Sequence, residues 1–232
     1  MTENKLSKYF IYAVGEIILV VIGILIALWL NNLNQEKVNA QEREKLKAEL
    51  ISELSENKEF FKNYKAYAEA CRKKVIHILN LSAGDNTKLP TDTLRKYAID
   101  MMPFRSMSID ESRRNSAKSA GLLQLLNSEE INALAEYETV LENYKEARRI
   151  NSVFKEENRT LFLYLNSFDV LVKENDLVKH PDYNLSDDEF LSFLKDKETY
   201  RKLNDIYVST EVDVRWLNGI IEDIDRTIEA LN

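Results

Sequence analysis

The hydrophobic residues of the chain are concentrated in one run near its N-terminus. From Phe10 to Leu30, 21 residues contain a single charged side chain, that of Glu16. A helix of this length is about 31 Å long, which matches the ~30 Å hydrocarbon core of a bilayer. Tyr12 and Trp29 lie near its two ends, where aromatic rings favour the membrane–water interface. The pattern predicts a transmembrane helix at residues 10–30, preceded by a short flank at 1–9, with the lipid bilayer as a partner.

A cleaved signal peptide and a buried core helix are the alternatives to this membrane anchor. A signal peptide needs a shorter apolar stretch and a small-x-small cleavage site, which Leu28-Trp29-Leu30-Asn31 does not supply. No second apolar run of comparable length follows in the sequence. We therefore expect an uncleaved signal anchor and a single-pass membrane protein.

Beyond this run, the apolar positions advance by four and three residues in turn, which places them on one seam of a helix. The seam consists of Leu50, Leu54, Asn57, Phe61, Tyr64, Ala68, Cys71, Val75 and Ile78. After the apolar run, no glycine occurs before Gly84 and no proline before Pro90, so nothing forces a break. We predict a stalk helix at about 33–82 that continues the transmembrane helix.

The C-terminal part of the chain repeats this spacing. Its seam consists of Leu203, Tyr207, Thr210, Val214, Leu217, Ile221, Ile224, Ile228 and Leu231. Ser128, followed by Glu129 and Glu130, is a typical helix start, because a serine hydroxyl caps free amides and carboxylates suit the positive helix end. Turn formers and prolines set the other boundaries. The expected helices are about 91–101, 112–127, 128–173, 186–197 and 199–231.

These elements predict an all-α fold, in which the transmembrane helix continues into the stalk helix and an antiparallel helical bundle forms outside the membrane. The bundle occupies one domain, residues 31–232, and the last helix folds back along the stalk. The heptad seams could also form an intermolecular coiled coil. We favour the intramolecular bundle, because other apolar helices of the chain are available to cover the seams.

The composition of the chain argues against nucleic-acid binding, metal binding and catalysis. The formal net charge of −7 disfavours a nucleic-acid partner, which requires a basic surface. One cysteine, Cys71, and two histidines, His77 and His180, cannot together supply a zinc or iron–sulfur site. No catalytic fingerprint surrounds either histidine, and no phosphate-binding glycine loop is present. We expect no catalytic, cofactor-binding or metal site and no enzyme activity.

Glu16 is the unusual residue of the apolar run. An ionisable side chain at mid-membrane costs about 2.5–3.5 kcal/mol, so it usually has a partner. Glu16 and Gly23 share a helical stripe, and Gly23-x-x-x-Ala27 is a small-xxx-small pair that lets a second helix approach closely. We predict a helix–helix contact through Gly15, Glu16, Gly23 and Ala27, with a copy of the chain in a homo-oligomer or with another membrane protein. The alternative is that Glu16 snorkels to the surface or is protonated.

Two segments resemble a known family. Y-A-V-G-E-I-I-L-V-V-I-G-I-L-I-A-L-W-L-N-N, from Tyr12 to Asn32, resembles the N-terminal signature of an uncharacterised family of bacterial single-pass membrane proteins, the domain of unknown function sixty-ninety. K-S-A-G-L-L-Q-L-L-N-S-E-E-I, from Lys118 to Ile131, is similar to a mid-chain motif of that family. The resemblance implies a bacterial inner-membrane protein and implies no catalytic residues.

The charges flanking the apolar run tie and do not by themselves set its orientation. Lys5, Lys8 and the α-amino group precede it, and Lys37, Arg43 and Lys45 follow it. Basic N-terminal tails in the family that the chain resembles favour a cytoplasmic N-terminus and a periplasmic bundle. Three functions are then open: an interaction or scaffold protein, which we favour; a sensor or ligand-binding module; and a channel or transport subunit with Glu16 around a pathway.

Overall fold

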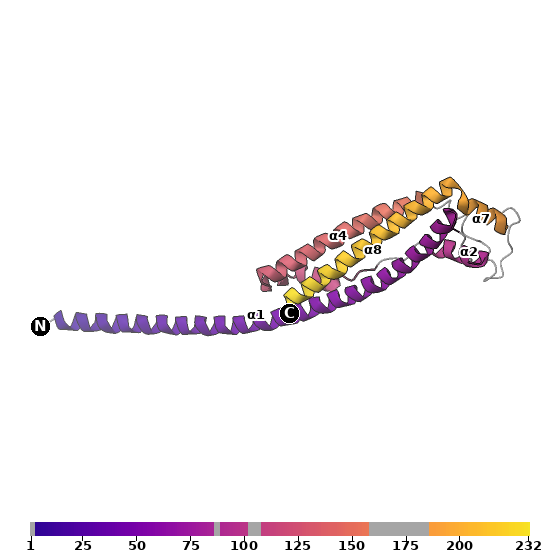
Figure 1. The fold of residues 1–232 in the computed structure, drawn as a ribbon. Coiled ribbons are helices and arrows are strands. Elements are labelled where there is room, and N and C mark those ends of the chain that lie inside the picture. Colours follow the sequence, from indigo (N-terminus) through magenta and orange to yellow (C-terminus); the bar gives the residue numbers. More distant parts are fainter. Residues whose placement is uncertain (1–2, 86–88, 102–107, 158–185) are drawn as a thin grey trace, which may run out of the picture.

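The computed structural model describes residues 3–85, 89–101, 108–157 and 186–232. This part of the chain is helical, with short connections and no strand (Figure 1). The all-α prediction is confirmed. The elements in chain order are α1 (Glu3–Ser82), α2 (Thr91–Asp100), α3 (Ser112–Ser119), the 3₁₀ helix η1 (Leu122–Leu125), α4 (Ser128–Glu157), α7 (Asp187–Lys195) and α8 (Lys197–Leu231).

Helix α1 is a single helix of 80 residues, as the lack of interior proline predicts. At 1.5 Å per residue it is about 120 Å long. Its N-terminal half stands apart from the other elements, and its C-terminal half forms one side of a helical bundle (Figure 1). Among the side chains of α1 that the structure describes, Leu46 is the first buried one. The end of the bundle at Leu46 is called the near end below, and the end at Ser82 the far end.

Three long helices form the bundle. Lys58 of α1 pairs with Asp225 of α8, and Arg72 pairs with Glu211 at 2.6 Å, so α8 runs antiparallel to α1. Helix α4 runs parallel to α1, since it begins at the near end and continues toward the far end (Figure 1). Helix α8 is therefore antiparallel to both neighbours, and the predicted return of the last helix along the stalk is confirmed.

The predicted seam of α1 lies in the core. Its residues Leu50, Leu54, Phe61, Tyr64, Val75 and Ile78 are all buried. On α8, Val214, Leu217 and Ile224 are buried, but Ile221 and Ile228 are only half-buried. Ile220 and Thr227 take the inward positions instead. Because α8 packs against both α1 and α4, its buried face is wider than a heptad seam and includes neighbouring positions.

One predicted helix is interrupted in the structure, and another is described only in part. A continuous helix at 112–127 is wrong: α3 ends at Ser119, and Gly121 takes a left-handed conformation with φ of 70° before η1 begins. Such a residue stops an α-helix, and glycine adopts it without the steric cost of a Cβ. Helix α4 extends to Glu157, and the rest of the helix predicted at 128–173 lies outside the described residues.

The far end of the bundle is closed by a second, smaller core. Short helices α2 and α7 place Leu94, Ala98, Phe190 and Leu194 around Val75, Ile78 and Leu81 of α1. Helix α7 begins with a capping box between Ser186 and Glu189, and Asp196 caps α8. These caps explain why the last two predicted helices, 186–197 and 199–231, are separate elements.

Candidate functional site

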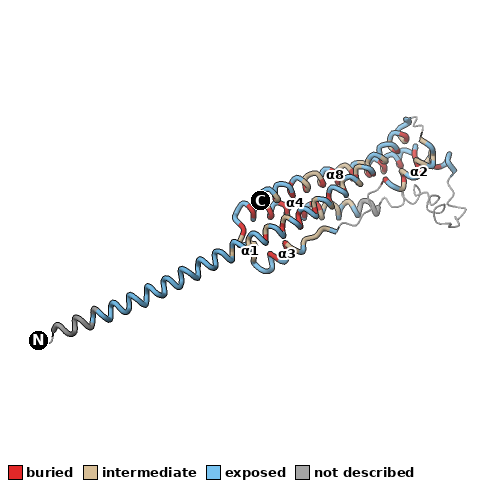
Figure 2. The backbone as a smooth tube through the Cα atoms, turned by 90° about the horizontal axis from the view of Figure 1, so that it is seen from below, coloured by how far each residue is buried: buried red, intermediate tan, exposed pale blue. Residues whose placement is uncertain are grey.

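The N-terminal half of α1 exposes an apolar surface that no other described element covers (Figure 2). Large side chains there are open, with Leu19 at 74% and Trp29 at 60% exposure. The most apolar window of this helix has a mean hydropathy of 2.7. Within the described part of the chain, it is the one helix that is long and apolar enough to cross a membrane. The predicted span thus lies on a helix suited to it by length and composition.

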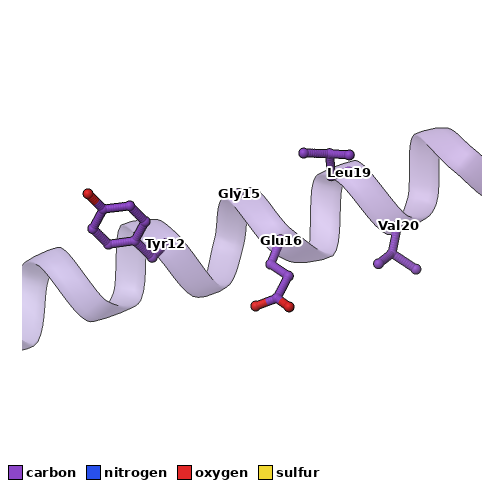
Figure 3. A pocket seen from close by; sticks show the side chains of 5 residues that line it. All are labelled: Tyr12, Gly15, Glu16, Leu19 and Val20. Carbon is purple, nitrogen blue, oxygen red and sulfur yellow. The ribbon is translucent and has the colours of Figure 1, made fainter.

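Gly15 leaves a hollow beside Glu16 on this surface. Tyr12, Glu16, Leu19 and Val20 border the hollow, and the Glu16 carboxylate extends away from the helix (Figure 3). A Cβ added at Gly15 or at Gly23 would meet nothing within 4 Å. The helix backbone is therefore accessible at both glycines, which a close helix–helix approach requires. The contact through Gly15, Glu16, Gly23 and Ala27 stays a prediction.

The bundle does not cover the continuation of this face. Steps of four and three residues from Ala27 lead to Asn31, Asn34, Val38, Gln41 and Lys45, which are all exposed. The buried seam starts instead at Leu46, which is 3% exposed. Neighbouring residues of a helix are about 100° apart around its axis, so the two faces are distinct. A second chain can approach the stripe without displacing the bundle.

A buried polar cluster at the near end is the site that sequence reasoning missed. Glu53 of α1 is 1% exposed, and its Oε2 accepts the backbone N–H groups of Arg113 at 2.7 Å and Arg114 at 3.1 Å. The Asn57 amide donates to the Asp110 carbonyl at 2.6 Å, and its Oδ1 accepts the Asp110 N–H at 3.0 Å. Two side chains of α1 therefore hold the start of α3.

The surroundings of Glu53 set its ionisation. Burial raises the pKa of this carboxyl, and the two backbone N–H bonds and the nearby Arg114 charge offset only part of that rise. The ionised form is thus less favourable in the fold than in water. Glu53 acts as the hydrogen-bond acceptor of the two backbone N–H groups at the start of α3.

Arg114 connects α3 to α4. Its side chain is 2% exposed and pairs with Glu111 at 2.9 Å and Glu138 at 3.2 Å. The guanidinium also lies over the Tyr137 ring, 5.1 Å from its centroid. Glu111 in turn pairs with Lys145 of α4. Two carboxylates and an aromatic face offset part of the hydration that this buried arginine loses.

Glu130 makes the direct polar link between α1 and α4. It pairs with Arg43 at 2.8 Å and Lys47 at 3.2 Å. Asn127 accepts the Glu130 N–H at 2.9 Å and donates its own N–H to the Glu130 carboxylate at 2.8 Å. Asn127 therefore caps α4, and Ser128, expected to be the cap, is the first helical residue. Burial alone would raise the pKa of Glu130, but these partners lower it.

Comparison of the chain with protein-family models, with curated proteins and with solved structures finds no match. The resemblance of residues 12–32 and 118–131 to a family of membrane proteins stays a prediction. Function is therefore argued from the geometry of this chain alone.

His77 and Cys71, which were singled out in the sequence, lie apart from these clusters. His77 is exposed, with its ring 5.6 Å from that of Tyr97. Cys71 is buried in the seam of α1. His180 lies outside the described residues. Within the described part of the chain, no group of three or more histidine, cysteine, aspartate or glutamate residues is arranged to hold a metal ion.

One signal in the sequence pointed to the missed cluster. Asn57 interrupts an otherwise apolar heptad seam, and a buried amide requires partners. Those partners lie 53 positions away, in the polar and aperiodic segment before α3, whose conformation no periodicity predicts. Glu53 gave no signal, since its position beside Leu54 fits a solvated helix edge equally well.

Proposed function

We propose that this protein is a single-pass, membrane-anchored interaction or scaffold protein of the bacterial envelope. The observation that carries the proposal is the continuity of α1. One helix leads from the exposed apolar surface at Phe10–Leu30 into the core of the bundle, which begins at Leu46. A bundle built on its own anchor helix can leave the membrane only if that helix leaves the lipid.

The length of exposed helix between the apolar segment and the bundle supports a role in presenting the bundle to a protein partner. The 16 residues from Leu30 to Leu46 hold the bundle about 24 Å beyond the apolar segment. The polar headgroup layer takes up about 5–8 Å of this distance. The remainder keeps the near end of the bundle clear of the bilayer, where a protein partner can reach it.

Assembly through the anchor belongs to the same proposal. The stripe of Glu16, Gly23 and Ala27, with Gly15 at its edge, contacts another spanning helix, either that of a second copy or that of a different membrane protein. A partner in the bilayer also gives the Glu16 carboxyl a hydrogen-bond acceptor or donor in place of water. In this proposal the apolar segment spans the bacterial inner membrane. The N-terminus lies in the cytoplasm and the bundle lies in the periplasm.

Fractionation of cells that express the full chain tests the anchor. Wild type is expected in the membrane pellet after carbonate washing, and the double substitution Ile18→Arg, Leu25→Arg is expected to shift the protein out of it. Substitution of exposed Ala40 by arginine beyond the span is the control and leaves the distribution unchanged. Unaggregated full-length wild type in the aqueous fraction without detergent would overturn the proposal.

A sensor is the second candidate, and the same continuity of α1 favours it, because a shift within the bundle acts directly on the helix in the membrane. Its test is ligand stabilisation of the purified full chain. A small molecule that raises the melting temperature in a concentration-dependent way would favour a sensor, since selective binding to the folded state stabilises it. Partner capture without any such ligand favours the scaffold.

A further inference from the structure

Residues 108–126, called the wedge below, fill the near end of the bundle between two of its long helices. Helix α8 packs closely against both α1 and α4, whereas the backbones of α1 and α4 approach each other less closely. The wedge includes α3 and η1, and Figure 2 shows α3 beside α1 at the near end. Its residues Ala117 and Leu126 belong to the main core. The wedge thus helps to set the spacing of α1 from α4.

Helix α3 depends on its neighbours for its existence. It has 8 residues, fewer than the ~12–15 that an isolated helix needs in water. Its sequence, SRRNSAKS, buries only Arg114 and Ala117, and its N-cap residue makes no side-chain cap bond. The Ser112 amide donates to Asp110 Oδ1, and the next two amides donate to Glu53 of α1. A residue 60 positions away therefore completes the N-terminus of α3.

We propose that the wedge is a detachable conformational element. Glu53 and Asn57 fasten it to α1, and Glu111 and Arg114 fasten it to α4. Its release lets α4 shift against α1 about the pairs of Glu130 with Arg43 and Lys47, which remain in place, while α8 stays packed. The proposal goes beyond the proposed function and holds whether or not the scaffold role is correct. Because α1 is continuous, a change of spacing at the near end acts on the helix that leads to the apolar segment.

The chemistry of the fasteners favours release of the wedge as a unit. Its polar links to α1 and α4 are hydrogen bonds and ion pairs, whose groups water can solvate once the wedge moves out. Of its apolar side chains only Ala117 and Leu126 are buried, and Ile109, Leu122 and Leu123 are half-buried against the main core. The contact of α1 with α8, by contrast, buries a long apolar seam that water does not replace. Burial also raises the pKa of Glu53, so this carboxylate gains hydration on release. Segments with few buried apolar contacts open before the core does.

Hydrogen exchange of single backbone amides, measured by NMR on the full chain in detergent micelles, tests whether Glu53 fastens the wedge to α1. In Glu53→Leu the amides of Arg113 and Arg114 are expected to exchange at least about 10-fold faster, because their acceptor is gone. Glu53→Gln keeps an acceptor oxygen and is expected to retain protection. Glu56→Gln is the matched control, since Glu56 is exposed and pairs only with the Arg113 side chain in this segment. The Ile220 amide in α8 keeps its protection in all variants.

Distances between spin labels test the movement of α4. In a Cys71→Ala background, labels at Ser55→Cys and Glu136→Cys report α1–α4, and labels at Ser55→Cys and Glu222→Cys report α1–α8; all three labelled positions are exposed. Glu53→Leu is expected to broaden the first distance distribution and leave the second unchanged. Broadening of both, no change in either, or loss of protection at Ile220 would overturn the proposal. Amides of Arg113 and Arg114 that are as strongly protected in wild type as the Ile220 amide would also overturn it, because the wedge would then open only together with the core.

Discussion

Glu53 and Glu130 are both buried carboxylates at the near end of the bundle, but their surroundings shift their pKa values in opposite directions. Glu53 meets two backbone amides and one partly compensated arginine, and burial dominates. Glu130 has two cations, Arg43 and Lys47, in addition to its cap bonds. The first is a hydrogen-bond acceptor, and we expect glutamine, which keeps an acceptor oxygen, to replace it. The second is an ion-pair residue that links α1 to α4 through its charge.

Acid titration separates the role of Glu130 from that of an ordinary surface carboxylate. Because the fold lowers its pKa below the usual 4.5, the unfolded chain takes up the proton first, and stability is lost as the pH falls below that value. Glu130→Gln is expected to lower the free energy of unfolding by about 1–3 kcal/mol at pH 7. The variant should also show a weaker loss of stability below pH 4.5, as measured by urea unfolding.

Glu129 provides the control for this titration. It lies in the same first turn of α4 and is exposed. Glu129→Gln removes the same charge from the same helix end and is expected to change stability by less than about 0.5 kcal/mol. Equal effects of the two substitutions would show that the helix dipole, and not the Arg43 and Lys47 pairs, explains the stabilisation.

At the scale of elements, the periodicity of apolar residues predicted the long helices and their buried faces. The long helices α1 and α8 and the buried seam Leu50 to Ile78 followed from spacing alone, because residues three and four apart lie on one face of an α-helix. The wedge did not follow. Helix α3 in the wedge depends on a hydrogen-bond acceptor from α1. It ends just before the left-handed Gly121, and the surrounding residues are helix formers that give no sign of this break. Long-range polar contacts and single backbone conformations have no periodic signature.

Two glycines test this account of the elements. Gly121 has a φ of 70°, so Gly121→Ala is expected to destabilise the protein by about 1 kcal/mol, although a Cβ there meets nothing within 4 Å. Gly219 lies within α8 and has equal space. Gly219→Ala is therefore expected to stabilise by about 0.5–1 kcal/mol through helix propensity. Thermal melting of the two variants checks the opposite signs, and stabilisation by both would contradict a left-handed Gly121.

At the scale of the whole molecule, the distribution of apolar surface sets apart the two halves of α1. The C-terminal half buries its seam against α8 and the wedge, and the N-terminal half exposes large apolar side chains around its full circumference. Exposed apolar surface of this extent is not stable in water. Lipid covers most of it in the proposed arrangement, and a second helix covers the stripe at Glu16, where lipid cannot hydrogen-bond a carboxyl.

Substitutions within the apolar helix test whether that stripe is an assembly surface. The double change Glu16→Leu, Gly23→Leu removes the carboxyl and adds bulk where helices approach, so we expect a shift of the full chain in lipid nanodiscs or micelles from larger to smaller complexes by native mass measurement. Val14→Leu, Val21→Leu is the matched control, because these positions lie on the opposite side of the helix at the same depth. A helix contact predicts dissociation only in the first variant. Equal complex sizes in wild type and both variants would instead mean that Glu16 is accommodated by lipid and water alone, as a snorkelling or protonated side chain.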